Sequence, residues 1–182
     1  MFHLMIDIET LALAANAYVT QVGFCVVDDI TNGFVMHPKN FWIDDTQPGE
    51  VDINTISWWM KQSDAARQSV FDDRPLKTAP KEMFSIFEDV VRQFKPEVWG
   101  SPAMFDLPIL TSMWHGKKPW VYNMERDMMT LYKLIDPRGV LKPPANKLAH
   151  DAASDADWQA RYLLNLLQAL RTSQGTQLPA SM

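Results

Sequence analysis

The stretch "LMIDIET", residues 4–10, predicts a strand that ends in two carboxylates. Its apolar run, residues 4–6, is typical of a strand in the middle of a sheet, and the run is followed by the carboxylates of Asp7 and Glu9. Side chains two apart on a strand point to the same face. Two like charges so close repel each other unless a cation lies between them. The pair therefore indicates a metal site at the end of a central strand, although a strand end that opens to solvent is also compatible with it.

Strand patterns dominate the first third of the chain, over 2–8, 18–28 and 33–43. The pair Asn32-Gly33 is a hairpin signal between the last two, so we expect an antiparallel meander. Later segments have mainly helical periodicity. We expect helices over 54–70 with a break near Ser63, 79–94 with Thr78 as its cap, 104–114, 127–134 and 151–171, and strands over 97–100 and 119–122. This order predicts an α/β fold with a mixed five-stranded sheet, the three-strand meander plus parallel strands, flanked by helices.

The composition fits one domain, which we expect over 1–172 with a polar C-terminal tail over 173–182. The chain has 182 residues, 47% of them hydrophobic, and a formal net charge of −5. That charge disfavours a nonspecific nucleic-acid binder, unless divalent cations offset it. No apolar stretch approaches the ~18 residues that span a bilayer, and no secretory signal is visible, so we expect a cytoplasmic protein with no membrane partner. The single cysteine, Cys25, lies in an apolar run and is expected to be buried.

Two further acids stand where the ligands of open α/β sheets gather. Asp106 is in the first turn of the helix expected after strand 97–100, although an acid there can also serve only the helix dipole. If Asp151 caps the last helix, Asp155 lies one turn in and His150 stays on the preceding loop. A histidine that is not a metal ligand is a natural general base near neutral pH. A capping acid beside a surface histidine is the alternative interpretation.

These residues, in this order, resemble the DEDD superfamily of 3′→5′ exonucleases, in its DEDDh branch, on a ribonuclease-H-like fold. The matching residues are Asp7 and Glu9 in "DIET", Asp106 in "FDLPIL", and Asp155 with His150 in "HDAASD". The stretches 56–67, 98–106 and 125–131 are similar to a bacterial and phage subgroup of small exonucleases. That subgroup is similar to the mycobacterial-type exoribonuclease domain and, more distantly, to ribonuclease T. The resemblance covers roughly residues 3–170.

The resemblance implies a phosphodiester hydrolase that works with two divalent cations, Mg²⁺ or Mn²⁺, which prefer oxygen ligands. It implies that Asp7 bridges both cations, that Glu9 and Asp155 share one of them, and that Asp106 acts through water. His150 would take the proton from the attacking water. The expected substrates are the 3′ ends of single-stranded RNA or DNA, which would be released as nucleoside 5′-monophosphates. A homodimer is also implied.

Six residues are expected to contact the substrate. They are Thr10 and Leu11, directly after Glu9; Phe105, beside Asp106; and Arg138, Lys142 and Lys147, in the proline-rich loop 136–147. A core position for Phe105 and a solvated basic loop are the alternatives. Of the neighbouring Trp58 and Trp59, at most one can face substrate, because adjacent side chains on a helix point different ways; burial is the expected role of the pair.

Two other functions remain open at this point. "DIET" also resembles the start of haloacid-dehalogenase-like phosphatases, in which Asp7 would be the nucleophile. That family has aspartate where this chain has Glu9, and it would leave His150 without a role. The second alternative is an inactive nuclease fold that only binds nucleic acid. Such a module should have lost one or more of the acids, whereas all five expected positions are filled here.

Overall fold

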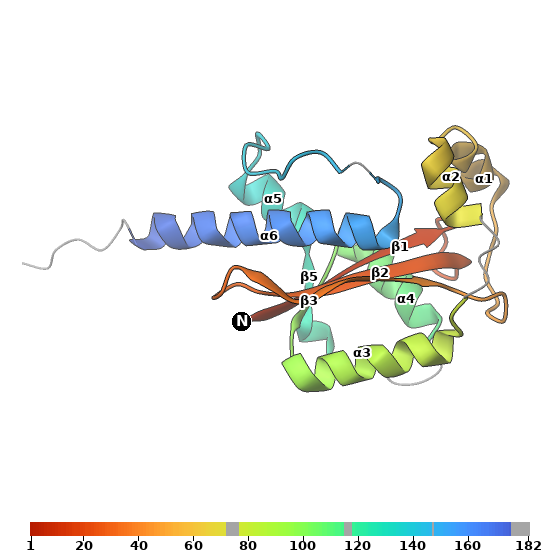
Figure 1. The fold of residues 1–182 in the computed structure, drawn as a ribbon, viewed down its shortest axis with the longest axis horizontal. Coiled ribbons are helices and arrows are strands. Elements are labelled where there is room, and N and C mark those ends of the chain that lie inside the picture. The colour runs from red at the N-terminus through yellow and green to blue at the C-terminus, as the bar shows by residue number, and fades with distance from the viewer. Residues whose placement is uncertain (72–76, 115–117, 147, 176–182) are drawn as a thin grey trace, which may run out of the picture.

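The computed structural model describes residues 1–71, 77–114, 118–146 and 148–175 (Figure 1). Its centre is a five-stranded sheet in the order β3-β2-β1-β4-β5. The strands are β1 (Phe2–Thr10), β2 (Val19–Asp28), β3 (Gly33–Trp42), β4 (Glu97–Gly100) and β5 (Glu125–Asp127). β1, β2 and β3 pair antiparallel, whereas β4 pairs parallel with both β1 and β5. The predicted mixed sheet, a meander extended by parallel strands, is confirmed.

Helices cover both faces of this sheet. They are α1 (Ile53–Trp59), α2 (Asp64–Phe71), α3 (Pro80–Phe94), α4 (Ala103–Ser112), α5 (Met128–Ile135) and α6 (Ala152–Gly175), with a 3₁₀ turn η1 (Tyr122–Met124). In Figure 1, α5 and α6 lie on one face and α3 and α4 on the other, while α1 and α2 stand at the end where β1 stops. The predicted break near Ser63 is confirmed, since it separates α1 from α2.

The two faces of β1 bury different cores. Leu4 and Ile6 belong to the core that α3 and α4 cover, whereas Met5 belongs to the core beneath α6. Because side chains alternate along a strand, Asp7 and Glu9 continue the row of Met5 onto the α6 face. The central strand thus carries its two carboxylates to the side where α6 begins.

Helix α6 approaches the sheet closely at Gly23 of β2. A Cβ atom at Gly23 would lie 2.0 Å from the carbonyl carbon of Ala152, so no side chain fits there. One helical turn after Ala152, the carbonyl oxygen of Ala156 lies 3.5 Å from the Sγ atom of the buried Cys25. The burial expected for Cys25 is confirmed. These small residues let the first turn of α6, which carries Asp155, lie against the sheet.

The strand predicted over 119–122 is wrong. The last strand, β5, lies at 125–127, and η1 precedes it. Trp120 is buried in the core under α3 and α4, and its Nε1 donates a hydrogen bond to Glu125 at 2.8 Å. The segment therefore turns its large side chain inward instead of extending along β4.

The predicted cap of α3 is also wrong. Ala79 occupies the N-cap position and its side chain makes no capping hydrogen bond, while Pro80 begins the helix as expected. Thr78 instead pairs with Ile43 in an isolated β-bridge.

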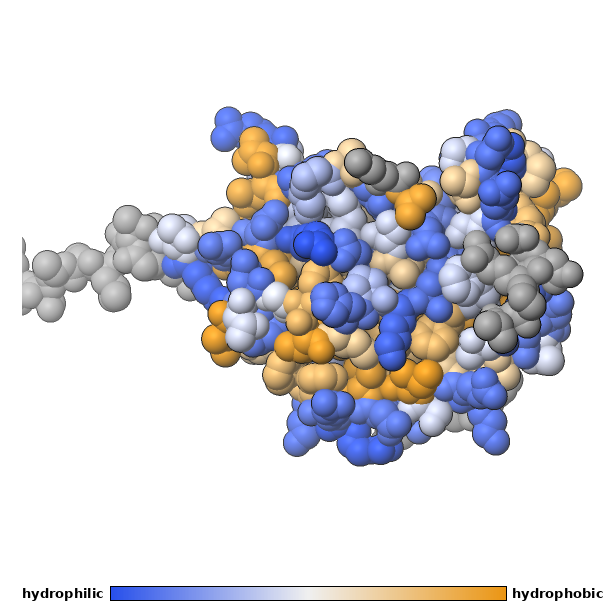
Figure 2. Space-filling model, in the orientation of Figure 1, coloured by the Kyte–Doolittle hydropathy of each residue, from blue (hydrophilic) through white to orange (hydrophobic). Residues whose placement is uncertain are grey.

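Figure 2 shows hydrophobic side chains gathered between the sheet and α3 on this face, with hydrophilic residues above and below them. Among the helices of the described ranges, none combines the length and apolar character that crossing a bilayer requires.

Candidate active site

Three elements bring the predicted acids together. Asp7 and Glu9 come from β1, Asp106 from the first turn of α4, and Asp155 from the first turn of α6. Glu9 and Asp106 are buried, and the others are partly buried. The backbone N–H of Ser101 donates to Asp106 Oδ2 at 2.7 Å and fixes that carboxylate at the end of β4.

Burial raises the pKa of all four carboxyls, and repulsion from the other site carboxylates raises it further at Asp7 and Glu9. Burial raises the pKa of Asp7 well above its usual range, and the charges of the other three carboxylates raise it further. The pKa of Glu9 is raised in the same way, first by burial and then by Asp155 and Asp106. Burial raises the pKa of Asp106 to about 7 and also raises the pKa of Asp155. Carboxylates that oppose one another's ionisation are a donor set that a hard divalent cation stabilises.

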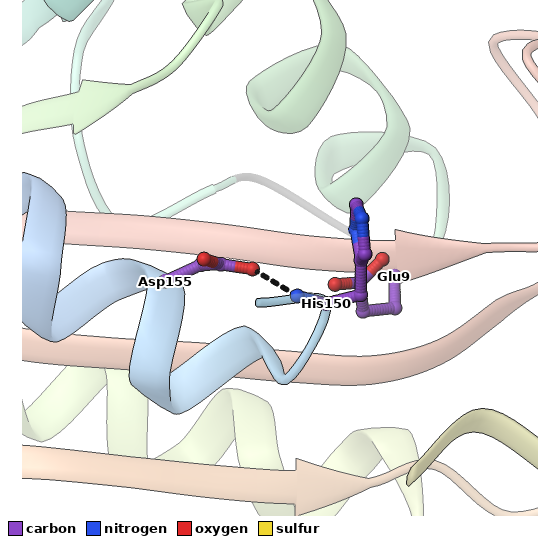
Figure 3. Close-up of side chains that lie close together, drawn as sticks. All are labelled: Glu9, His150 and Asp155. Atoms are coloured by element: carbon purple, nitrogen blue, oxygen red, sulfur yellow. Dashed lines mark hydrogen bonds between the residues drawn. The ribbon is translucent and has the colours of Figure 1, made fainter. Parts of the chain in front are cut away.

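His150 lies at the end of the loop that precedes α6, next to Glu9 and Asp155. Its backbone N–H donates to Asp155 Oδ2 at 2.7 Å, and its φ of 67° is in the left-handed region (Figure 3). Ligand atoms of Glu9, His150 and Asp155 all lie within 4.8 Å of one another. The structure therefore brings the predicted histidine to the predicted acids, close enough for these three side chains to hold a metal ion.

Two tryptophans of α1 contact the His150 ring edge-on. The ring centroids of Trp58 and Trp59 lie 5.1 and 5.6 Å from that of His150, with interplanar angles of 87° and 81°. Trp59 is 1% exposed and donates through Nε1 to Thr10 O at 2.9 Å, whereas Trp58 is 44% exposed. The burial expected of the pair is therefore confirmed for Trp59 and wrong for Trp58, which is open to solvent. Their contact with His150 was not predicted, because no sequence pattern links residues so far apart.

A cavity of about 440 Å³ opens beside Glu9. Its lining is mainly apolar and comprises Ile8, Glu9, Thr10, Leu13, Asp52, Asn54, Thr55, Trp58, Trp59 and Phe105. Two of the expected substrate contacts, Thr10 and Phe105, are thus at the cavity. Leu11 instead packs against the small core around Trp59, and its N–H donates to Tyr18 O at 2.9 Å.

The first part of the basic loop is attached to α6 some distance from the acids. Arg138 and Lys142 are exposed. The Tyr162 hydroxyl donates to Asp136 at 2.8 Å, which fixes the start of the loop. Tyr162 lies about two helical turns after Asp155, or ~10 Å along the axis of α6. The third residue, Lys147, lies outside the described residues. A role of this loop in substrate binding stays a prediction.

Two amides that bind the acids were missed from the sequence. Asn146 Nδ2 donates to Asp155 Oδ1 at 2.7 Å, and Gln159 Nε2 donates to Asp7 Oδ1 at 2.7 Å. The hydroxyl of Ser154 in turn donates to Asn146 at 2.8 Å. Gln159 follows Asp155 by four residues, so both lie on one face of α6; this spacing was the available signal.

A polar cluster fixes the start of α6. Asp151 accepts hydrogen bonds from Asn40 Nδ2 at 3.0 Å and from Ser69 Oγ at 3.1 Å. The amide of Asn40 also donates to the buried Gln21 at 2.7 Å. Asp151 Oδ1 accepts from the N–H of Ser154 at 3.0 Å, which confirms the capping role expected for Asp151. Residues of β3 and α2 thereby hold Asp151, the residue that follows His150, and the buried Gln21 of β2 supports Asn40.

Fold and site together define a class of protein, the exonucleases built on a ribonuclease-H-like sheet. Within that class, the chain belongs to the family described as the 3′-5′ exoribonuclease Rv2179c-like domain, whose sequence profile matches residues 2–167. The resemblance inferred from the motifs is confirmed. A comparison with curated proteins gave no match.

Solved structures support the same fold. An exonuclease I structure, described as suggesting how processivity is achieved, is similar with a TM-score of 0.66 at 14% identity, covering 94% of this chain and 43% of that one. E. coli exonuclease I in complex with a dA16 oligonucleotide gives 0.66 at 14%, covering 95% and 42%. A 3′-exonuclease that recognises the histone mRNA stem-loop gives 0.58 at 11%, covering 92% and 81%. The chain thus spans less than half the length of the exonuclease I chains it matches.

Proposed function

We propose that this protein is a 3′-5′ exonuclease that removes nucleoside 5′-monophosphates from the 3′ ends of single-stranded RNA or DNA. The observation that carries the proposal is the convergence of four carboxyls with raised pKa values and one histidine beside an apolar cavity. The description of the family favours RNA. The family match leaves the phosphatase alternative without support.

The acids fit a site for two divalent cations, Mg²⁺ or Mn²⁺. Asp7, Glu9, Asp106 and Asp155 supply only oxygen donors, and the buried Oε1 of Gln159 beside them lacks a hydrogen-bond partner among the described residues. When bound, such cations activate the attacking water and offset charge on the phosphate. In this proposal the four carboxylates hold the cations, and His150 accepts the proton of the attacking water.

The cavity beside Glu9 is proposed to receive the 3′-terminal nucleotide. Apolar side chains such as Phe105 and Trp58 offer faces for a base, and the volume of about 440 Å³ is in the range of small-molecule sites. A nucleotide seated in the cavity would contact Trp58, and the ring of Trp58 in turn contacts the ring of His150. Occupancy of the cavity and placement of the proton acceptor are therefore joined through one side chain.

The test is digestion of matched 5′-labelled single-stranded RNA and DNA with Mg²⁺, Mn²⁺ or EDTA. We expect a ladder that shortens from the 3′ end, that EDTA abolishes, and that Asp7→Asn reduces by several orders of magnitude. Asp89→Asn, at an exposed acid of α3 paired with Arg92, is the matched control and should leave the ladder unchanged.

Two results would overturn the proposal. Substrates that stay intact with every cation, while the protein is folded and retains them in a binding assay, would favour the binding module. A digestion that begins at internal sites would exclude an exonuclease. The rate ratio between RNA and DNA identifies the preferred sugar, and the homodimer stays a separate prediction.

A further inference from the structure

Gln159 stands directly behind the central carboxylate of the site. It is 9% exposed, and its Nε2 donates to Asp7 Oδ1 at 2.7 Å. The other amide atom, Oε1, is buried and has no hydrogen-bond partner in the part of the chain that the structure describes. An unpaired buried acceptor destabilises the folded state, so a folded protein keeps one only where something else satisfies it.

The direction of the hydrogen bond follows from the charge of Asp7. If the amide were turned over, Oε1 would face a carboxylate oxygen, and two acceptors would repel each other. With Nε2 as donor, Oδ1 of Asp7 is occupied and its orientation is fixed, while Oδ2 remains for a cation. Oε1 is then available to accept from a water molecule that accompanies the cation.

The neutral charge of Gln159 matters as much as its donor. A lysine or arginine at this position would neutralise Asp7 and compete with a cation for the same carboxylate. An amide orients the carboxylate and leaves its charge in place. Its position on α6, four residues after Asp155, means that one helix face supplies both an acid and the support of another acid.

From this geometry we propose that Gln159 is a positioning residue of the cation site: it orients Asp7 and so sets the affinity for the divalent cation. The inference rests on the proposed function, since the cation is the one proposed there. Hydrogen-bond partners of metal ligands typically change metal affinity 10- to 100-fold when they are removed.

The experiment is a Mn²⁺ titration of the full chain, in which the EPR signal reports free Mn²⁺, paired with thermal unfolding in EDTA. Gln159→Met keeps the length of the side chain and removes the donor. We expect its Mn²⁺ dissociation constant to rise about 10- to 100-fold. Gln168→Met, at an exposed glutamine of the same helix, is the matched control and should bind Mn²⁺ like the wild type.

Gln159→Asn keeps the amide but shortens its reach by one methylene, so it should also weaken Mn²⁺ binding and disturbs burial less. Variants that bind Mn²⁺ as the wild type does, even with a lowered melting temperature in EDTA, would show a structural role only and overturn the inference. If the wild type binds no Mn²⁺, both the inference and the cation site fail. If the wild type binds Mn²⁺ and digests RNA or DNA while the variants match its affinity, only the inference fails.

Discussion

At the scale of single residues, the placement of His150 depends on its backbone as well as its ring. Its N–H is bound to Asp155, its φ is positive, and its ring meets Trp58 and Trp59 edge-on. A left-handed conformation is uncommon for a residue other than glycine and persists only where the surroundings fix it. The imidazole is thus carried to the acids by a constrained turn.

Replacing His150 by Ala should therefore remove the proposed proton acceptor and leave the acids in place. We expect kcat to fall about 10²- to 10⁴-fold, with little change in KM, as measured by single-nucleotide release. His37→Ala, at an exposed histidine of β3, is the control. A parallel loss of Mn²⁺ affinity in His150→Ala would instead identify the imidazole as a metal ligand, and full activity would exclude any direct role.

The positions of Asp7, Glu9, Asp106 and Asp155 could be expected from the sequence, because two lie on a recognisable strand, two lie in the first turns of recognisable helices, and together they match a family motif. The supporting contacts were not predictable in the same way. Trp58 reaches His150 across 92 residues, and Gln159 reaches Asp7 across 152. Such pairs depend on how the elements pack, which local periodicity does not specify.

At the scale of elements, the site depends on how closely α6 approaches β2. That approach is possible because Gly23 has no side chain beneath Ala152.

The position of the edge strand β5 could not be predicted from the sequence. A strand of three residues has no detectable alternation, and the inward turn of Trp120 moved it to 125–127. Long, periodic elements were therefore predicted well, whereas this short strand at the sheet edge was not.

Gly23→Ala tests the close approach. The added Cβ would lie 2.0 Å from backbone atoms of Ala152, so α6 must shift. We expect the free energy of unfolding to fall by about 1–3 kcal/mol in urea titrations. Nuclease activity should fall more than stability alone explains.

Gly33→Ala is the matched control, because its Cβ would meet the nearest atom, Thr31 O, at 3.9 Å. It should be nearly neutral. Equal stability of the two variants would contradict the packing described for α6.

At the scale of the whole molecule, the acids concentrate negative charge in one place and oppose folding when no cation is present. Burial raises the pKa of Asp106 to about 7, above its unfolded value near 4. Between these values the folded protein holds a proton that the unfolded chain has released. Stability in EDTA therefore falls as pH rises through that window.

The expected result is a melting temperature in EDTA that is higher at about pH 5 than at about pH 8. Asp106→Asn should flatten this dependence and raise the melting temperature at about pH 8 by at least about 5 °C. Mg²⁺ or Mn²⁺ should stabilise the wild type more at the higher pH, because cations replace protons on the carboxylates. A melting temperature in EDTA that rises steadily with pH would contradict this account.

Because the first acids come from β1 and the last ones from α6, the order of synthesis also matters. On a translating ribosome, Asp7 and Glu9 leave the exit tunnel long before His150 and Asp155 have been added. Until α6 has emerged and packed over Gly23, the nascent chain carries an incomplete site. If the proposed function holds, the nascent chain cannot act as a nuclease before α6 has been synthesised and has packed on the sheet.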